Sequence, residues 1–177
     1  KLGLLKFDIL GLANLNIIKQ SLRVIKKIHG KDIDINKIDA DDPNPYKILR
    51  KGDTIGVFQL ESEGMKKLLK ELKVSNIEEV SAVIALYRPG PMQFIPLYIG
   101  NKLGLSKIEY IDDRLAPIIN TTYGVMIYQE QLMRLANELA GFTLGQADIL
   151  RKAIGKKKID LLMEQKQKLI DGLVAHG

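Results

Sequence analysis

A lysine and an acid, Lys6 and Asp8, interrupt an apolar run near the start of the chain. Residues 4–10 are otherwise apolar and predict a buried strand, in which side chains two positions apart share a face about 6.6 Å apart. An ionised carboxylate in such a strand is costly unless a cation or hydrogen-bond donors meet it. That cation could be a metal ion or Lys6, and an exposed pair with Lys6 would contribute only about 0–1 kcal/mol. Asp8 could instead cap the helix that follows.

A second concentration of charge lies before the last predicted helix. Five cations fall within eight residues with no acid among them: Arg151, Lys152, Lys156, Lys157 and Lys158. If residues 144–155 form a helix, Lys152 and Lys156 lie one turn apart, with Arg151 beside them. Phosphate is the natural anion for such a surface, either of a triphosphate or of a nucleic-acid backbone. The plainer interpretation is a solvated helix end, where the helix dipole favours cations.

The segment Arg88-Pro89-Gly90-Pro91 is a third candidate. Its composition predicts a helix stop and a tight turn. The functional alternative is a loop that contacts a nucleic-acid backbone, in which Arg88 reaches a phosphate. Spacing assigns no role to Gln59, Tyr128 or Gln129, which are polar positions beside apolar runs.

Composition limits the class of protein. The 177 residues are 46% apolar, which is enough for a core, and the net charge of +6 weakly favours a polyanionic partner. The absence of cysteine excludes disulfides and zinc–thiolate sites. His29 and His176 stand beside glycines at predicted helix ends, where they fit C-terminal cations better than catalysts. With no apolar run near the roughly 20 residues that span a bilayer and no signal-peptide pattern, we expect a cytoplasmic protein without a membrane partner. A start at Lys1, within a strand, favours excision from a longer protein.

The periodicity predicts a mainly α fold with a few short strands (α+β). Apolar residues at spacings of three and four predict helices at residues 15–29, 46–50, 62–72, 76–87, 92–103, 132–140, 143–155 and 159–173. Short strands are expected at residues 4–10, 56–60, 108–110 and 125–128. Ser62 and Thr143 are expected to cap the helices that follow them, and Asn76 to begin another.

The motifs resemble a known family. KFDILGL at 6–12, GVFQLES at 56–62, ALYRPGP at 85–91, YGVMIYQEQ at 123–131 and LRKAIGKKK at 150–158 resemble, in order, the alpha subunit of bacterial DNA polymerase III. Leu12 and the YRPGP sequence are more similar to the DnaE type than to the PolC type of these C-family polymerases. The resemblance implies that residues 1–13 end the palm domain and that residues 14–177 form the N-terminal part of a helical fingers domain.

The resemblance also implies a function, which is template-directed nucleotidyl transfer from a dNTP to a primer 3′-OH by a two-metal mechanism. In that family three aspartates hold two Mg²⁺ ions, and Asp8 matches the third of them. Lys6, Arg151 and Lys152 match residues that contact the dNTP phosphates, although many relatives have arginine at the position of Lys152. Possible further phosphate or DNA contacts are Arg88, Lys156, Lys157 and Lys158.

The implied partners are primer-template DNA, dNTP and other replicase subunits, the last reached through parts of the protein outside these residues. The other two carboxylates are absent from this chain, so the fragment alone is expected to be inactive. Two alternatives from other classes remain open. One is a non-catalytic, basic helical module that binds nucleic-acid backbone, and the other is a helical module that binds another protein.

Overall fold

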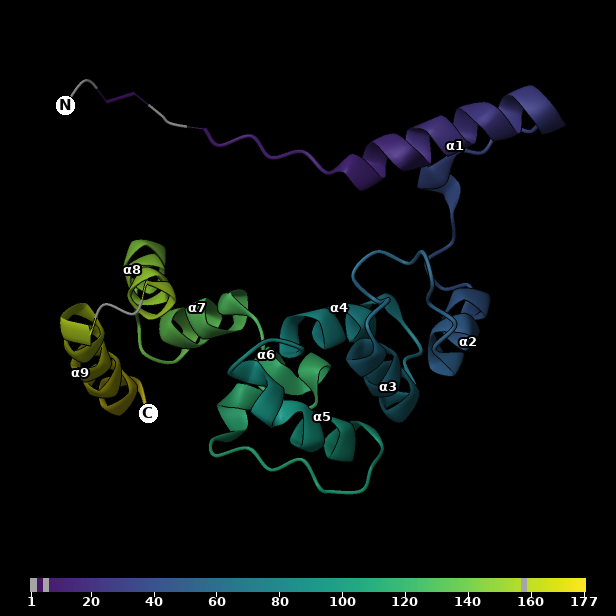
Figure 1. Cartoon of the computed structure of the whole chain (residues 1–177). Coiled ribbons are helices and arrows are strands. Elements are labelled where there is room, and N and C mark those ends of the chain that lie inside the picture. Colours follow the sequence, from purple (N-terminus) through teal and green to yellow (C-terminus); the bar gives the residue numbers. More distant parts are fainter. Residues whose placement is uncertain (1–2, 5–6, 157–158) are drawn as a thin grey trace. The chain divides into compact units, whose positions relative to one another are not determined.

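The computed structural model describes residues 3–4, 7–156 and 159–177, and all the regular secondary structure in these residues is helical (Figure 1). The helices are α1 (Ala13–His29), α2 (Pro43–Lys51), α3 (Glu63–Leu72), α4 (Ile77–Leu86), α5 (Ile95–Lys102), α6 (Ala116–Ile119), α7 (Gln129–Glu138), α8 (Leu144–Gly155) and α9 (Ile159–His176). Short 3₁₀ helices are η1 (Ile35–Lys37), η2 (Pro91–Phe94), η3 (Asp113–Leu115) and η4 (Asn120–Thr122). The chain divides into two compact units, Lys1–Asp42 and Pro43–Gly177. None of the helices in the described part of the chain is both long enough and apolar enough to cross a bilayer.

The predicted helices are confirmed, and so are the three predicted capping residues, although α1, α2 and α7 begin two or three residues earlier than predicted and α6 was not predicted. The hydroxyl of Ser62 accepts a hydrogen bond from the backbone N–H of Met65 at 3.3 Å, and Asn76 caps α4 through the backbone N–H of Glu79. Thr143 exchanges hydrogen bonds with Gln146, which makes a capping box. These caps were predictable because each involves residues three positions apart.

The predicted short strands are wrong, since no described residue lies in a strand. Residues 56–60 form turns that are closed by a hydrogen bond from the Thr54 hydroxyl to the carbonyl of Leu60. The extended residues 125–128 direct two of their backbone N–H groups to the side chain of Gln131, and residues 108–110 are irregular. An apolar run becomes a strand only where another strand pairs with it, and the run itself does not reveal that partner.

The strand expected at residues 4–10 is likewise not seen in the part of it that the structure describes. Residues 7–12 lie in no helix or strand and lead directly into α1. Residues 5 and 6 lie outside the described residues.

Two groups of helices build the second unit. In the first, α3, α4 and α5 enclose a core in which Leu69, Leu72 and Val83 are fully buried. In the second, α7, α8 and α9 pack around Phe142. Gly172 lets α9 approach the end of α7, because a Cβ at this position would collide with the carbonyl oxygen of Ala140.

A buried carboxylate connects the helices of the first group. The side chain of Glu79 is 3% exposed. Its Oε2 accepts hydrogen bonds from the backbone N–H of Ser75 at 2.7 Å and from Lys102 Nζ at 2.8 Å, and its Oε1 accepts one from the Tyr123 hydroxyl at 2.7 Å. Burial acts to raise the pKa of Glu79, but the hydrogen bonds from Lys102 and Tyr123 outweigh burial and hold the pKa below its usual value. Glu79 is therefore ionised and fully paired.

Lys102 completes the same network. Its side chain is 8% exposed, and besides Glu79 it donates to the carbonyl oxygens of Leu72 at 2.7 Å and of Lys73 at 2.9 Å. An ammonium group has three donors, and all three are used here. Lys102 thus neutralises the buried carboxylate and also caps the C-terminal end of α3, whose carbonyls have no partner within the helix.

We expect Lys102→Met to lower the free energy of unfolding by about 3–5 kcal/mol, because it leaves Glu79 buried without its cation and removes the donor to two carbonyls. Chemical denaturation followed by circular dichroism measures this change. Lys67→Met is the matched control, because Lys67 lies on α3 with its side chain 78% exposed and its nearest acid oxygen, on Glu71, at 3.8 Å. Equal stability of the two variants would contradict the structural role of Lys102.

Candidate functional site

Arg151 is held on α8 by contacts on two sides. Its Nε and Nη2 donate to Oδ1 of Asp148 at 2.9 and 2.8 Å, and its Nη1 donates to Oε1 of Gln129 at 3.2 Å. Asp148 lies one turn earlier on the same helix, whereas Gln129 is the first residue of α7. The guanidinium group is therefore oriented by two helices.

Lys152 shares the same acid. Its Nζ lies 2.6 Å from Oδ2 of Asp148, so one carboxylate meets both cations through its two oxygens. Hydrogen bonds from Lys152 and then from Arg151 lower the pKa of Asp148. The sequence analysis assigns no role to Asp148, which lies just before the basic stretch. Its spacing of three and four residues from the two cations is nevertheless the usual signal for ion pairs within a helix.

The cluster of Arg151, Lys152 and Asp148 keeps one net positive charge and unused donors. Three of the five N–H groups of a guanidinium are occupied, which leaves two on Arg151 for a further acceptor. The side chains of Arg151 and Lys152 are 33% and 54% exposed. An anion such as phosphate can therefore reach both cations without displacing Asp148 from Arg151 Nε.

The rest of the predicted basic surface is only partly described. Lys156 is exposed and directly follows α8, and its backbone N–H donates to the carbonyl of Lys152 at 3.0 Å. Lys157 and Lys158 lie outside the described residues. The structure thus brings together Arg151 and Lys152, with Lys156 one turn further along.

Asp8 and Lys6 belong to the first unit. Asp8 is exposed in the extended segment that precedes α1, and Lys6 lies outside the described residues. A carboxylate oxygen is a ligand that Mg²⁺ accepts. However, the described residues contain no group of three His, Asp or Glu side chains that could hold a metal ion. Asp8 therefore does not form a metal site with other described residues.

Arg88 lies in the turn that the sequence predicts. Its carbonyl accepts a hydrogen bond from the backbone N–H of Met92 at 3.1 Å, and Gly90 has φ 98° and ψ −73°, a conformation that favours glycine. The exposed Arg88 borders a hollow of about 240 Å³ that Gln59 and Ser62 also line. The contact between Arg88 and a phosphate stays a prediction.

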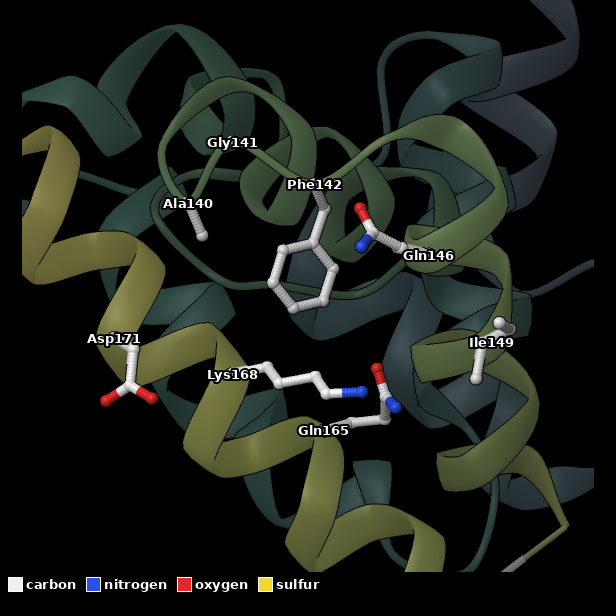
Figure 2. Close-up of a pocket in the computed structure, with 8 residues that line it drawn as sticks. All are labelled: Ala140, Gly141, Phe142, Gln146, Ile149, Gln165, Lys168 and Asp171. Carbon is white, nitrogen blue, oxygen red and sulfur yellow. The ribbon is translucent and has the colours of Figure 1, made fainter.

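A larger cavity, of about 300 Å³, lies between α8 and α9 beside the loop that joins α7 to α8 (Figure 2). Phe142 lies in its interior, and Gln146 of α8 faces Gln165 and Lys168 of α9. None of the predicted site residues that the structure describes lines it. The cavity and the cations of α8 are therefore separate features.

Comparison with known proteins identifies the family. The family described as "Bacterial DNA polymerase III alpha subunit finger domain" matches residues 14–177. The DNA polymerase III subunit alpha of Aquifex aeolicus (strain VF5) is 50% identical over 179 residues, which cover 100% of this chain and 15% of the relative. The protein of the same name from Staphylococcus aureus (strain COL) is 49% identical over 177 residues, covering 100% of this chain and 17% of the relative. That of Halalkalibacterium halodurans is 46% identical over 175 residues, covering 99% of this chain and 16% of the relative.

The chain spans about a sixth of the length of these curated relatives. The family match takes in α1 from its second residue and every later helix, including the Arg151 cluster on α8. The chain therefore belongs to the bacterial DNA polymerase III alpha subunit finger domain family.

Proposed function

We propose that the chain contributes to template-directed nucleotidyl transfer from a dNTP to a primer 3′-OH, as a part of a DNA polymerase III alpha subunit. In this proposal residues 1–13 end the palm, and residues 14–177 form the N-terminal part of the fingers. The observation that carries the proposal is the pair of accessible cations, Arg151 and Lys152, fixed by one carboxylate on a finger-domain helix.

These two cations are suited to the triphosphate of a dNTP. Phosphoryl transfer depends mainly on positioning and on neutralising charge at the reacting and leaving phosphates. Arg151 is already oriented by Asp148 and Gln129, so little side-chain entropy is lost when phosphate binds its two free donors. Lys152 adds a point charge, which can contact phosphate without the planar geometry that a guanidinium group requires. Lys6, outside the described residues, is the proposed palm-side phosphate contact.

Asp8 is the proposed metal ligand of this chain. Two Mg²⁺ ions, bound by Asp8 and by two carboxylates from elsewhere in the intact subunit, would supply charge neutralisation at the attacking and leaving oxygens. The role of the Asp8 side chain is to present a carboxylate from the extended segment just before α1. A single carboxylate does not hold two metal ions, so we expect the 177 residues alone to be inactive.

Arg151→Ala in the intact subunit should raise KM for dNTP and lower kcat, for a combined loss in kcat/KM of about 10²–10³, because an oriented donor to the transition-state charge is removed. Steady-state primer extension at varied dNTP concentration measures this loss.

Arg134→Ala is the matched control for Arg151→Ala. Arg134 pairs with Glu138 at 2.9 Å on α7, so the control also breaks an ion pair between an arginine and an acid of its own helix. An unchanged dNTP dependence in the Arg151 variant would identify a solvated surface instead of a substrate site.

Asp8→Asn in the intact subunit should abolish nucleotide addition and leave primer-template binding nearly unchanged, because the amide keeps the size of the side chain and loses the charge that holds a metal ion. Primer extension and fluorescence anisotropy on labelled DNA measure the two properties. The control is Asp160→Asn, an exposed acid of α9. Retained extension, or lost DNA binding, would contradict the assigned role and favour a non-catalytic nucleic-acid-binding module.

A further inference from the structure

Helix α1 carries a row of cations along one face. Lys19, Arg23, Lys26 and Lys27 are all exposed. Successive helical residues differ by about 100° around the axis, so these four positions fall within an arc of about 100°. We call them the α1 cation row.

The row has little compensating charge. Residues 9–31 contain no acid at all. Lys26 pairs with Asp32 at 2.6 Å beyond the end of the helix. The other three cations form no ion pair with any residue that the structure describes. Like charges one turn apart repel each other, so this face gains stability from an external anion.

A neighbouring face of α1 is apolar. Leu15, Ile18, Leu22 and Ile25 recur at spacings of three and four, and their face centres roughly 110° around the helix axis from the cation row. The two faces therefore differ in chemistry, and the cations are not a by-product of a uniformly charged helix.

We infer that the α1 cation row binds the phosphate backbone of primer-template DNA, an inference that rests on the proposed function. The row runs from Lys19 to Lys27, which is eight steps along the helix or about 12 Å at 1.5 Å per residue. Duplex DNA carries roughly seven phosphate charges over that length of its axis. Asp8, the proposed metal ligand, precedes Ala13 at the start of α1 by only five positions. The row therefore follows closely in the chain the residue that is proposed to act at the primer 3′ end. Charge along a line, without a shaped pocket, suits a contact that does not depend on base sequence.

The test compares the salt dependence of DNA binding by the intact subunit and by the triple variant Lys19→Gln/Arg23→Gln/Lys27→Gln. We expect the slope of log Kd against log salt concentration to become shallower by about 2.7, because each phosphate contact contributes about 0.9. The loss of affinity should be equal for primer-templates of unrelated sequence. Fluorescence anisotropy between 50 and 200 mM salt, roughly the range over which such contacts weaken, measures both effects.

Two further variants keep the test decisive. Lys37→Gln/Lys51→Gln/Lys107→Gln removes the same charge from exposed positions outside the row and should leave the slope unchanged. Lys19→Arg/Arg23→Lys/Lys27→Arg keeps the charge and should keep the wild-type slope, which separates loss of charge from damage to the helix. An unchanged slope in the first triple variant overturns the inference, and so does an equal change in the control.

The outcome also separates this inference from the proposed function. If wild-type subunit extends primers and the row variant keeps its slope, the inference fails and the function stands. If wild-type subunit neither extends primers nor binds primer-template DNA, the proposed function fails. A basic amphipathic helix also suits an anionic membrane. Row-dependent binding to phosphatidylserine vesicles, with DNA binding unaffected by the variant, would therefore overturn the inference.

Discussion

The buried ion pair between Glu79 and Lys102 is the interaction on which the second unit depends. The two residues lie 23 positions apart, on α4 and α5, and both side chains are almost inaccessible to water. Removing two charges from water is expensive unless every donor and acceptor finds a partner. Here the surrounding carbonyls, the Ser75 N–H and the Tyr123 hydroxyl provide those partners. The pair specifies a single arrangement of α3, α4, α5 and η4, because any other arrangement leaves a buried charge unpaired.

A series of polar contacts leads from this pair toward the candidate site. Tyr123, bonded to Glu79, directly follows η4. In η4 the hydroxyl of Thr122 accepts a hydrogen bond from Gln131 of α7 at 2.7 Å. Two residues earlier on α7, Gln129 accepts from Arg151 of α8. The helix α7, which helps to orient the guanidinium group, is thus connected through η4 to the buried ion pair.

Asp148 pairs with both cations of the candidate site. Two adjacent cations without an acid would repel each other and sample many rotamers, whereas a carboxylate between them holds Arg151 in one orientation and partly screens the repulsion. The cluster retains one positive charge for an anion. The same carboxylate restrains both cations, so their positions are coupled.

The predictable part of this molecule is the part encoded by neighbours in sequence. Ser62, Asn76 and Thr143 act within three residues of their partners, and the caps follow from residue type alone. Asp148 could have been paired with Arg151 by the same local rule.

What the sequence could not reveal depends on distant partners. Glu79 resembles any acid in the first turn of a helix, and its burial depends on a lysine 23 residues away. Gln129 contacts Arg151 across 22 residues. The run at residues 125–128 has strand-like composition. Two of its backbone N–H groups, however, donate to the side chain of Gln131, so they are not available to a neighbouring strand.

A structure of the intact subunit with primer-template DNA and a non-hydrolysable dNTP tests the central claim most directly. The account predicts a triphosphate oxygen within hydrogen-bonding distance of Arg151 Nη1 or Nη2 and of Lys152 Nζ. Asp148 should still accept from Arg151 Nε, and the Asp8 carboxylate should lie on a metal ion next to the same triphosphate. A triphosphate bound away from α8, with Arg151 and Lys152 contacting only Asp148 and water, would contradict the account.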